Sequence, residues 1–120
     1  MTFFKEPKNT EKISWTKHVK GKMNFYQLGE GRLKRLLNNP KRIEKGIAPR
    51  TIAIMQPAGT KKHPTEIWLM YQKINQRAKI KDQKIRIISA WRYPGISPIH
   101  EPPPIPEDVL EDLKEYGYKN

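Results

Sequence analysis

The chain has 120 residues, the length of one domain, and it contains no cysteine, which excludes disulfides and thiolate metal sites. No apolar run approaches the roughly 20 residues of a membrane span, and the N-terminal MTFFKEPKNTEK lacks the apolar stretch of a signal peptide, so we expect a cytoplasmic protein with no membrane partner. The net charge of +12, from 24 basic and 12 acidic side chains, instead predicts a polyanionic partner.

Two helices are predicted in the first third of the chain. Residues 1–12 are polar and aperiodic, which indicates a flexible arm. Ser14 is a good N-cap, and a stripe of apolar residues at helical spacing follows it, which predicts a helix over 14–26. A second helix is expected over 30–38, with leucines inward and arginines outward, and the Asn-Asn-Pro sequence that ends at Pro40 stops it.

After Pro40 the apolar pattern changes to a period of two, which predicts strands. The expected strands are 42–48, 51–56, 66–72 and 84–91. The expected connections are an exposed loop over 56–65 and a basic hairpin connection over 73–83. Consecutive strands with short connections favour antiparallel pairing. The predicted fold class is therefore α+β, with two N-terminal helices packed on one face of a three- to four-stranded antiparallel sheet.

The C-terminal segment differs from the rest of the chain in composition. A proline-rich strap is expected at its start, and the acids after Pro106 predict a short helix with Val109, Leu110 and Leu113 along its apolar edge. We therefore expect three parts: an arm over 1–12, a domain over 13–95, and the strap with its acidic helix over 96–120.

The charge is divided unevenly between these parts. Residues 1–100 carry a net +16 and residues 101–120 a net −4. One hypothesis is that the acids of 107–112 lie against the basic surface and compete with phosphate. The alternatives are a solvated tail that only lowers the pI and a tail that braces the fold. A basic surface typical of a heat-adapted or lysine-rich proteome would explain the body charge without any ligand.

Candidate site residues were selected by side-chain chemistry. The three histidines, His18, His63 and His100, have no metal-ligand spacing, and no cofactor-binding motif is present, so neither a metal nor a cofactor is expected. A histidine and arginines cleave RNA without a metal when they move a proton and stabilise the phosphate. The candidate catalytic residues are His18, Arg86 and Arg92, and the candidate RNA-binding residues are Lys22, Arg32, Arg35, Trp91 and Tyr93. Each candidate also has a purely structural interpretation. His18 is then a helix histidine held by hydrogen bonds, Arg86 is a solvated arginine, and Trp91 is a core residue.

Several segments, in this order, resemble a family of short bacterial domains grouped with the BrnT and RelE-like toxins of toxin–antitoxin systems. They are Trp15-Thr16-Lys17-His18, Lys22-Met23, the helix from Arg32 to Leu37, Asn39-Pro40, Arg42-Ile43-Glu44-Lys45-Gly46, and the strand from Lys84 to Arg92 with its IRIISA sequence. The resemblance covers residues 13–95. It implies a RelE-like fold, metal-independent mRNA cleavage by His18, Arg86 and Arg92, and an antitoxin-like protein partner.

The chain also departs from that pattern. Asn24-Phe25-Tyr26-Gln27 stands where the BrnT core motif is expected, and Arg92 is displaced by one position after Trp91. Two functions therefore stay open: a basic RNA-binding domain that acts as a toxin-type endoribonuclease, and a non-enzymatic RNA- or protein-interaction module. A DNA-binding regulator is a third. The oligomeric state is not predicted.

Overall fold

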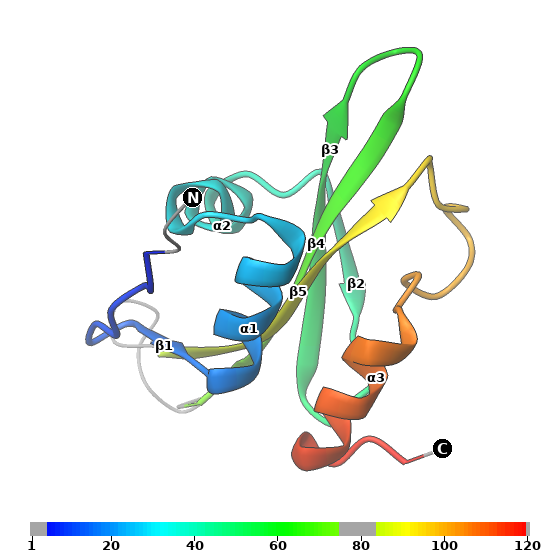
Figure 1. Ribbon diagram of the computed structural model, residues 1–120. Helices are drawn as coiled ribbons and strands as arrows, with labels where there is room; N and C mark the ends of the chain where they lie inside the picture. The colour runs from blue at the N-terminus through cyan, green and yellow to red at the C-terminus, as the bar shows by residue number, and fades with distance from the viewer. Residues whose placement is uncertain (1–4, 75–83, 120) are drawn as a thin grey trace.

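The computed structural model describes residues 5–74 and 84–119 and has the expected α+β class. Figure 1 shows its elements: β1 (Ile13–Trp15), α1 (Lys17–Tyr26), α2 (Glu30–Asn38), β2 (Arg42–Lys45), β3 (Thr51–Gly59), β4 (Pro64–Lys73), β5 (Ile85–Pro94), α3 (Glu107–Leu113) and a 3₁₀ turn (Lys114–Tyr116). Within the described part of the chain, no helix is long and apolar enough to cross a membrane.

The sheet is mixed and five-stranded, which corrects the prediction of a three- to four-stranded antiparallel sheet. Its strand order is β1-β5-β4-β3-β2; β1 runs parallel to β5, and the other pairs are antiparallel. The first strand occupies residues predicted as a helix start. Pairing with a strand some 70 residues away outweighs the local helical spacing there.

The first helix begins at Lys17 because Thr16, and not Ser14, is its N-cap. The Thr16 hydroxyl accepts a hydrogen bond from the Val19 amide at 3.2 Å and donates to the Ile87 carbonyl at 2.8 Å. One side chain therefore caps α1 and joins it to β5. The second helix spans the predicted residues 30–38.

Several strand ends also differ from the prediction, and β5 runs three residues further, to Pro94. The expected loop over 56–65 is largely a hairpin, because β3 and β4 stay paired as far as Gly59 and Pro64. Conversely, β2 ends at Lys45, where the Gly46 amide donates to the Thr51 carbonyl at 2.9 Å and closes a turn. A Cβ on Gly46 would lie 2.0 Å from the Thr51 hydroxyl oxygen, so this turn requires glycine. Most of the expected basic connection over 73–83 lies outside the described residues.

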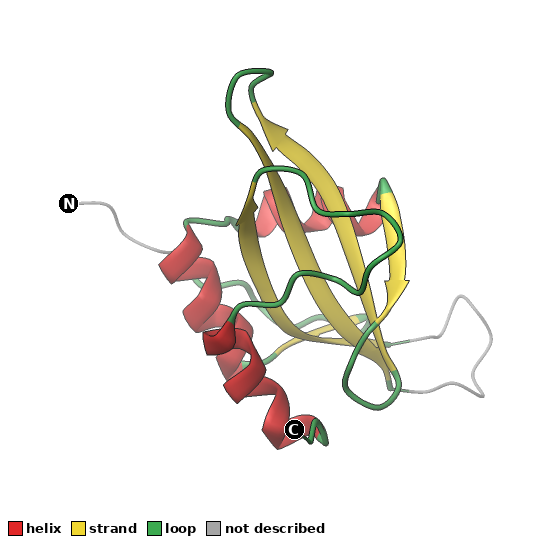
Figure 2. Cartoon of the chain, turned by 90° about the vertical axis from the view of Figure 1, so that its right-hand side faces the viewer, coloured by secondary structure: helices red, strands yellow, loops and turns green. Residues whose placement is uncertain are grey.

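Both faces of the sheet are covered. On one face α1 and α2 bury a core that includes Trp15, Val19, Met23, Leu33, Leu36, Ile54, Leu69 and Ile87. On the other face the strap and α3 cover a second core of Ala53, Met55, Trp68, Met70, Ile88, Trp91, Val109 and Leu113. Figure 2 shows the strap crossing this face before α3 begins. The C-terminal segment is thus the third layer of the fold and not an appendage.

Candidate functional site

A β-bulge in β5 separates the two arginines that were expected to act together. Met70 pairs with Ser89 and Tyr71 pairs with Ile87, so Ile88 is an extra residue in β5. Cross-strand partners share a face, and this places Arg86 with Gln72 on the α3 face and Arg92 with Ile67 on the α1 face. Without the bulge, two residues six positions apart would share one face. The predicted trio of His18, Arg86 and Arg92 is therefore not assembled at one point.

The basic face of α1 is already paired with acids of the C-terminal segment. His18 Nδ1 lies 3.1 Å from Asp112, and its Nε2 contacts Glu115. Lys22 Nζ lies 2.8 Å from Asp108 and 3.4 Å from Asp112. The hypothesis that acids lie against a basic surface is confirmed for these carboxylates and extends to Glu115. It is wrong for Glu107 and Glu111, which are exposed, with Glu111 bonded to Lys114 instead.

This contact between α1 and α3 shifts two pKa values upward. Burial alone would lower the pKa of Lys22, but the hydrogen bond to Asp108 and the charge of Asp112 outweigh it, so the pKa is raised. Burial, with the charge of Asp108 and a hydrogen bond to it, raises the pKa of Tyr26 to about 12 from 10.0. The Tyr26 hydroxyl lies 3.2 Å from both Asp108 oxygens.

A pH-dependent stability follows from this contact. Because folded Tyr26 holds its proton more tightly than the unfolded chain, its contribution is fully present below pH 10.0 and is lost as the pH rises toward about 12. The raised pKa of Lys22 acts in the same direction. We expect the free energy of unfolding, measured with urea across this range, to fall less steeply in Tyr26→Phe than in the wild type. Tyr118→Phe controls for the loss of one tyrosine, and equal slopes in Tyr26→Phe and wild type would contradict the assignment.

Arg92 has a structural role at the end of α1. Its Nε donates to the Tyr26 carbonyl at 2.8 Å and its Nη2 to the Gln27 carbonyl at 3.1 Å. These carbonyls belong to the last helical residue and to the C-cap, which has a left-handed φ of 58°. The guanidinium therefore satisfies helix-end acceptors that would otherwise need water.

A groove rich in arginines and amides lies between α2 and β3. It is lined by Arg32, Arg35, Asn38, Asn39 and Gln56, and we call it the arginine groove. Gln56 joins its two sides: its Oε1 accepts from Arg32, and its Nε2 donates to the Asn39 carbonyl at 2.8 Å.

The arginine groove concentrates positive charge without a local acid. Burial lowers the pKa of Arg32, and the charges of Arg35 and Arg92 add to the effect. Within residues 5–74 and 84–119, none of these three arginines forms an ion pair with a carboxylate. Arg32 and Arg35, which both line the groove, therefore lie close together, and no carboxylate of the described residues pairs with either.

The aromatic candidates on β5 belong to the second core. Trp91 has no exposed surface; its ring stacks on Trp68 with centroids 6.0 Å apart, and its indole N–H donates to the Pro104 carbonyl at 2.8 Å. Trp91 was predicted to contact RNA, and this burial makes it a core residue instead. Tyr93 is half-buried on the same face.

Tyr116 is a residue that sequence reasoning missed. Its ring makes an edge-on contact with His18, with centroids 5.9 Å apart. Burial raises its pKa, while a hydrogen bond to Thr16 and the charge of Arg86 oppose the rise. His18 and Tyr116 are therefore neighbours, and the charge of Arg86 acts on Tyr116 although 30 residues separate the two in the sequence.

A buried network fastens the strap, and it was also missed. Glu66, only 3% exposed, accepts from the Ser97 hydroxyl at 2.6 Å and the Trp68 indole N–H at 3.1 Å. Arg42 donates to the Ser97 hydroxyl at 2.8 Å and to the Glu101 carbonyl at 2.9 Å, and its guanidinium lies over the Trp68 ring. A glutamate within an apolar strand was the available sequence signal. In the described residues, no three His, Asp or Glu side chains are grouped to hold a metal ion.

Comparison with protein-family models, curated proteins and solved structures found no match for the chain.

Proposed function

We propose that the protein is an RNA-binding domain that holds the phosphate backbone in the arginine groove. The observation that carries the proposal is that two arginines, Arg32 and Arg35, line one groove and that neither pairs with a carboxylate in the described chain. A phosphate would offset their mutual repulsion. The planar fork of arginine suits phosphate oxygens, and the amides of Asn38, Asn39 and Gln56 supply further donors.

The distribution of acids supports the same face. The C-terminal acids pair with His18 and Lys22 on α1 and thereby neutralise that surface. The arginine groove lies on α2 and keeps its charge. Since the first 100 residues carry a net +16, a phosphate polymer is attracted to the body, and the arginine groove offers it two guanidinium groups that pair with no described carboxylate.

A toxin-type endoribonuclease is the second candidate. The observation that favours it is the edge-on contact of His18 with Tyr116, on which the charge of Arg86 also acts; these side chains together could move a proton and stabilise a phosphate. Two contacts count against it. Both ring nitrogens of His18 face carboxylates, and Arg92 is engaged with the end of α1. Binding without cleavage therefore ranks first.

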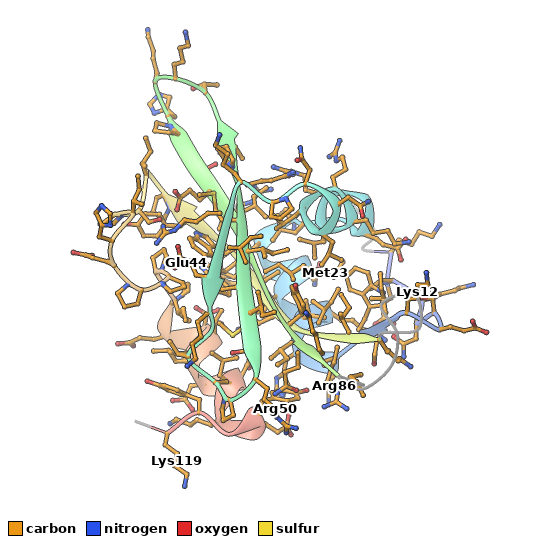
Figure 3. All side chains as sticks on the ribbon, turned by 180° about the vertical axis from the view of Figure 1, so that it is seen from behind. Lys12, Met23, Glu44, Arg50, Arg86 and Lys119 are labelled. Atoms are coloured by element: carbon orange, nitrogen blue, oxygen red, sulfur yellow. The ribbon has the colours of Figure 1, made fainter. Side chains whose placement is uncertain are left out.

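Arg35→Ala is expected to lower RNA affinity by about tenfold at low salt, because a removed phosphate contact costs on the order of 1.4 kcal/mol. The slope of log affinity against log salt should fall by about one. Arg50→Ala is the matched control: Arg50 is also an exposed arginine, and Figure 3 places it at the end of the sheet away from the β3–β4 hairpin.

The measurement is a titration of labelled RNA at several salt concentrations, with the bound RNA then run on a denaturing gel. Equal losses in Arg35→Ala and Arg50→Ala would mean that the groove is not the site. Fragments that disappear when Arg86 is replaced by alanine would favour the endoribonuclease.

A further inference from the structure

The β3–β4 hairpin extends beyond the rest of the sheet as an arm; from here on, the arm means the end of this hairpin and not residues 1–12. Pairing of β2 with β3 ends at Met55, and pairing of β5 with β4 ends at Thr65. Residues 59–64 therefore extend past both neighbouring strands, while Pro57 and Ala58 still pair with Glu66 and Thr65 of β4 and the Gly95 amide donates to the Pro64 carbonyl at 2.8 Å. Figure 1 shows this two-stranded arm rising above α2. The turn at its tip, residues 60–63, is exposed and open to a ligand from several directions.

The tip of the arm is basic and held in a defined turn. Lys61, Lys62 and His63 are exposed, and none of them pairs with an acid within the described residues. The Thr60 amide donates to the His63 carbonyl at 3.2 Å, and the His63 amide donates to the Thr60 hydroxyl at 3.0 Å. Gly59 has a φ of +79°, which a side chain would strain. The two lysines are thus presented from an ordered turn.

The arm and the arginine groove are joined at Gln56. This residue lies at the base of the arm in β3, and its side chain bonds Arg32 and the Asn39 carbonyl of the α2 end. The four residue-to-residue steps from Gln56 to Thr60 span about 13 Å in an extended strand. Two basic patches are therefore held at a fixed separation, one in the groove and one at the tip.

Among the described residues, the surroundings of these two patches carry no exposed Phe, Tyr or Trp ring. Proteins that bind single-stranded RNA stack bases on exposed aromatic rings. Trp15, Trp68 and Trp91 are at most 3% exposed, and the arginine groove is lined by arginines and amides. The exposed ring of Phe25 lies on α1 beside α3, in the hollow that contains His18. A ligand recognised by its phosphates alone fits this surface better than one recognised by its bases.

We propose that the ligand is double-stranded RNA, with one part of its backbone in the arginine groove and another at Lys61 and Lys62 on the arm. This inference rests on the proposed function and specifies it further. Double-stranded RNA is recognised mostly through its shape, phosphates and 2′-hydroxyls, because its deep major groove hides the base edges. Two basic patches held at a fixed separation suit that kind of recognition.

The test compares K61A/K62A with the charge-matched control K12A/K119A. Lys12 and Lys119 are exposed, and Figure 3 shows them at the side and the base of the molecule, far from the arm. Each protein is titrated with one RNA sequence as a duplex and as a single strand, and with the corresponding DNA duplex. We expect wild type to bind the RNA duplex at least about tenfold more tightly than the single strand or the DNA duplex. K61A/K62A should lose that preference, and its slope of log affinity against log salt should fall by about two. The control should keep the preference.

The outcomes separate the two proposals. If no RNA binds at low salt, the proposed function fails. If single-stranded RNA binds as tightly as the duplex, or if both double variants lose affinity equally, the arm has no specific role and this inference is overturned while RNA binding stands. If the DNA duplex binds as tightly as the RNA duplex and K61A/K62A weakens both, the arm is supported and the restriction to RNA is overturned. Unchanged thermal unfolding of both variants shows that the arm changes did not disturb the fold.

Discussion

Leu113→Ala is expected to lower the free energy of unfolding by roughly 2–5 kcal/mol, the usual cost of a cavity at a fully buried leucine. Leu113 has no exposed surface and packs in the second core with Val109, Trp68 and Trp91. Its removal leaves a cavity between α3 and the sheet, whose backbone is fixed by strand pairing and closes it poorly. Urea unfolding followed by tryptophan fluorescence measures the loss directly.

Leu110→Ala is the matched control for this change. It removes the same atoms from the same helix, but Leu110 is only half-buried at the edge of that core. We expect a clearly smaller loss there. If both variants lost the same small amount, α3 would not be a layer of the fold.

The burial of α3 also changes how the acidic tail is interpreted. If the tail only competed with phosphate, deleting residues 101–120 would tighten RNA binding without unfolding the domain. Because that deletion removes Val109 and Leu113 from the core, we expect the domain to lose stability instead, as a structural brace requires. The acids of α3 still neutralise His18 and Lys22, so the brace and the charge pairing occur in one segment.

Arg42→Met is expected to cost roughly 3 kcal/mol of unfolding free energy. The Arg42 side chain is 9% exposed and pairs with Glu44 at 2.8 Å; it also donates to Ser97 and to carbonyls of the strap. Since Glu44 is about a third exposed and the strap carbonyls lie in exposed contacts, most of the loss comes from the contacts with the buried Ser97 hydroxyl and the Trp68 ring. Detachment of the strap would also expose Trp68, the ring over which the guanidinium lies.

Two further variants make this prediction specific. Arg42→Lys keeps the charge but cannot reach Glu44, Ser97 and Glu101 with one planar fork, so we expect an intermediate loss. Lys45→Met changes an exposed cation on the same strand and should have little effect. The expected order of stability is therefore Lys45→Met, then Arg42→Lys, then Arg42→Met. A variant Arg42→Met as stable as Lys45→Met would refute the network, and equal losses in both Arg42 variants would refute the role of the fork.

Several features of this protein were determined by local sequence. The helix over 30–38 has its leucines on one side, and Pro40 and Pro106 mark a helix end and a helix start, so these elements were correctly placed. The change to a period of two after Pro40 predicted where β2 to β5 lie along the chain. Alternation along a strand, the spacing of leucines and the backbone limits of proline act over a few residues, which is why the sequence by itself reveals them.

Other features depended on contacts between distant segments. Ile13–Trp15 is a strand only because β5 lies beside it, and the bulge at Ile88 places Arg86 and Arg92 on opposite faces. The arginine groove exists because Gln56 of β3 meets Arg32 of α2, and α3 is buried because the sheet offers it Trp68 and Trp91. The sequence alone determined the basic charge, the α+β class and most element positions. Tertiary structure decided which charges are neutralised and which stay free, because that depends on burial and on partners far apart in the chain.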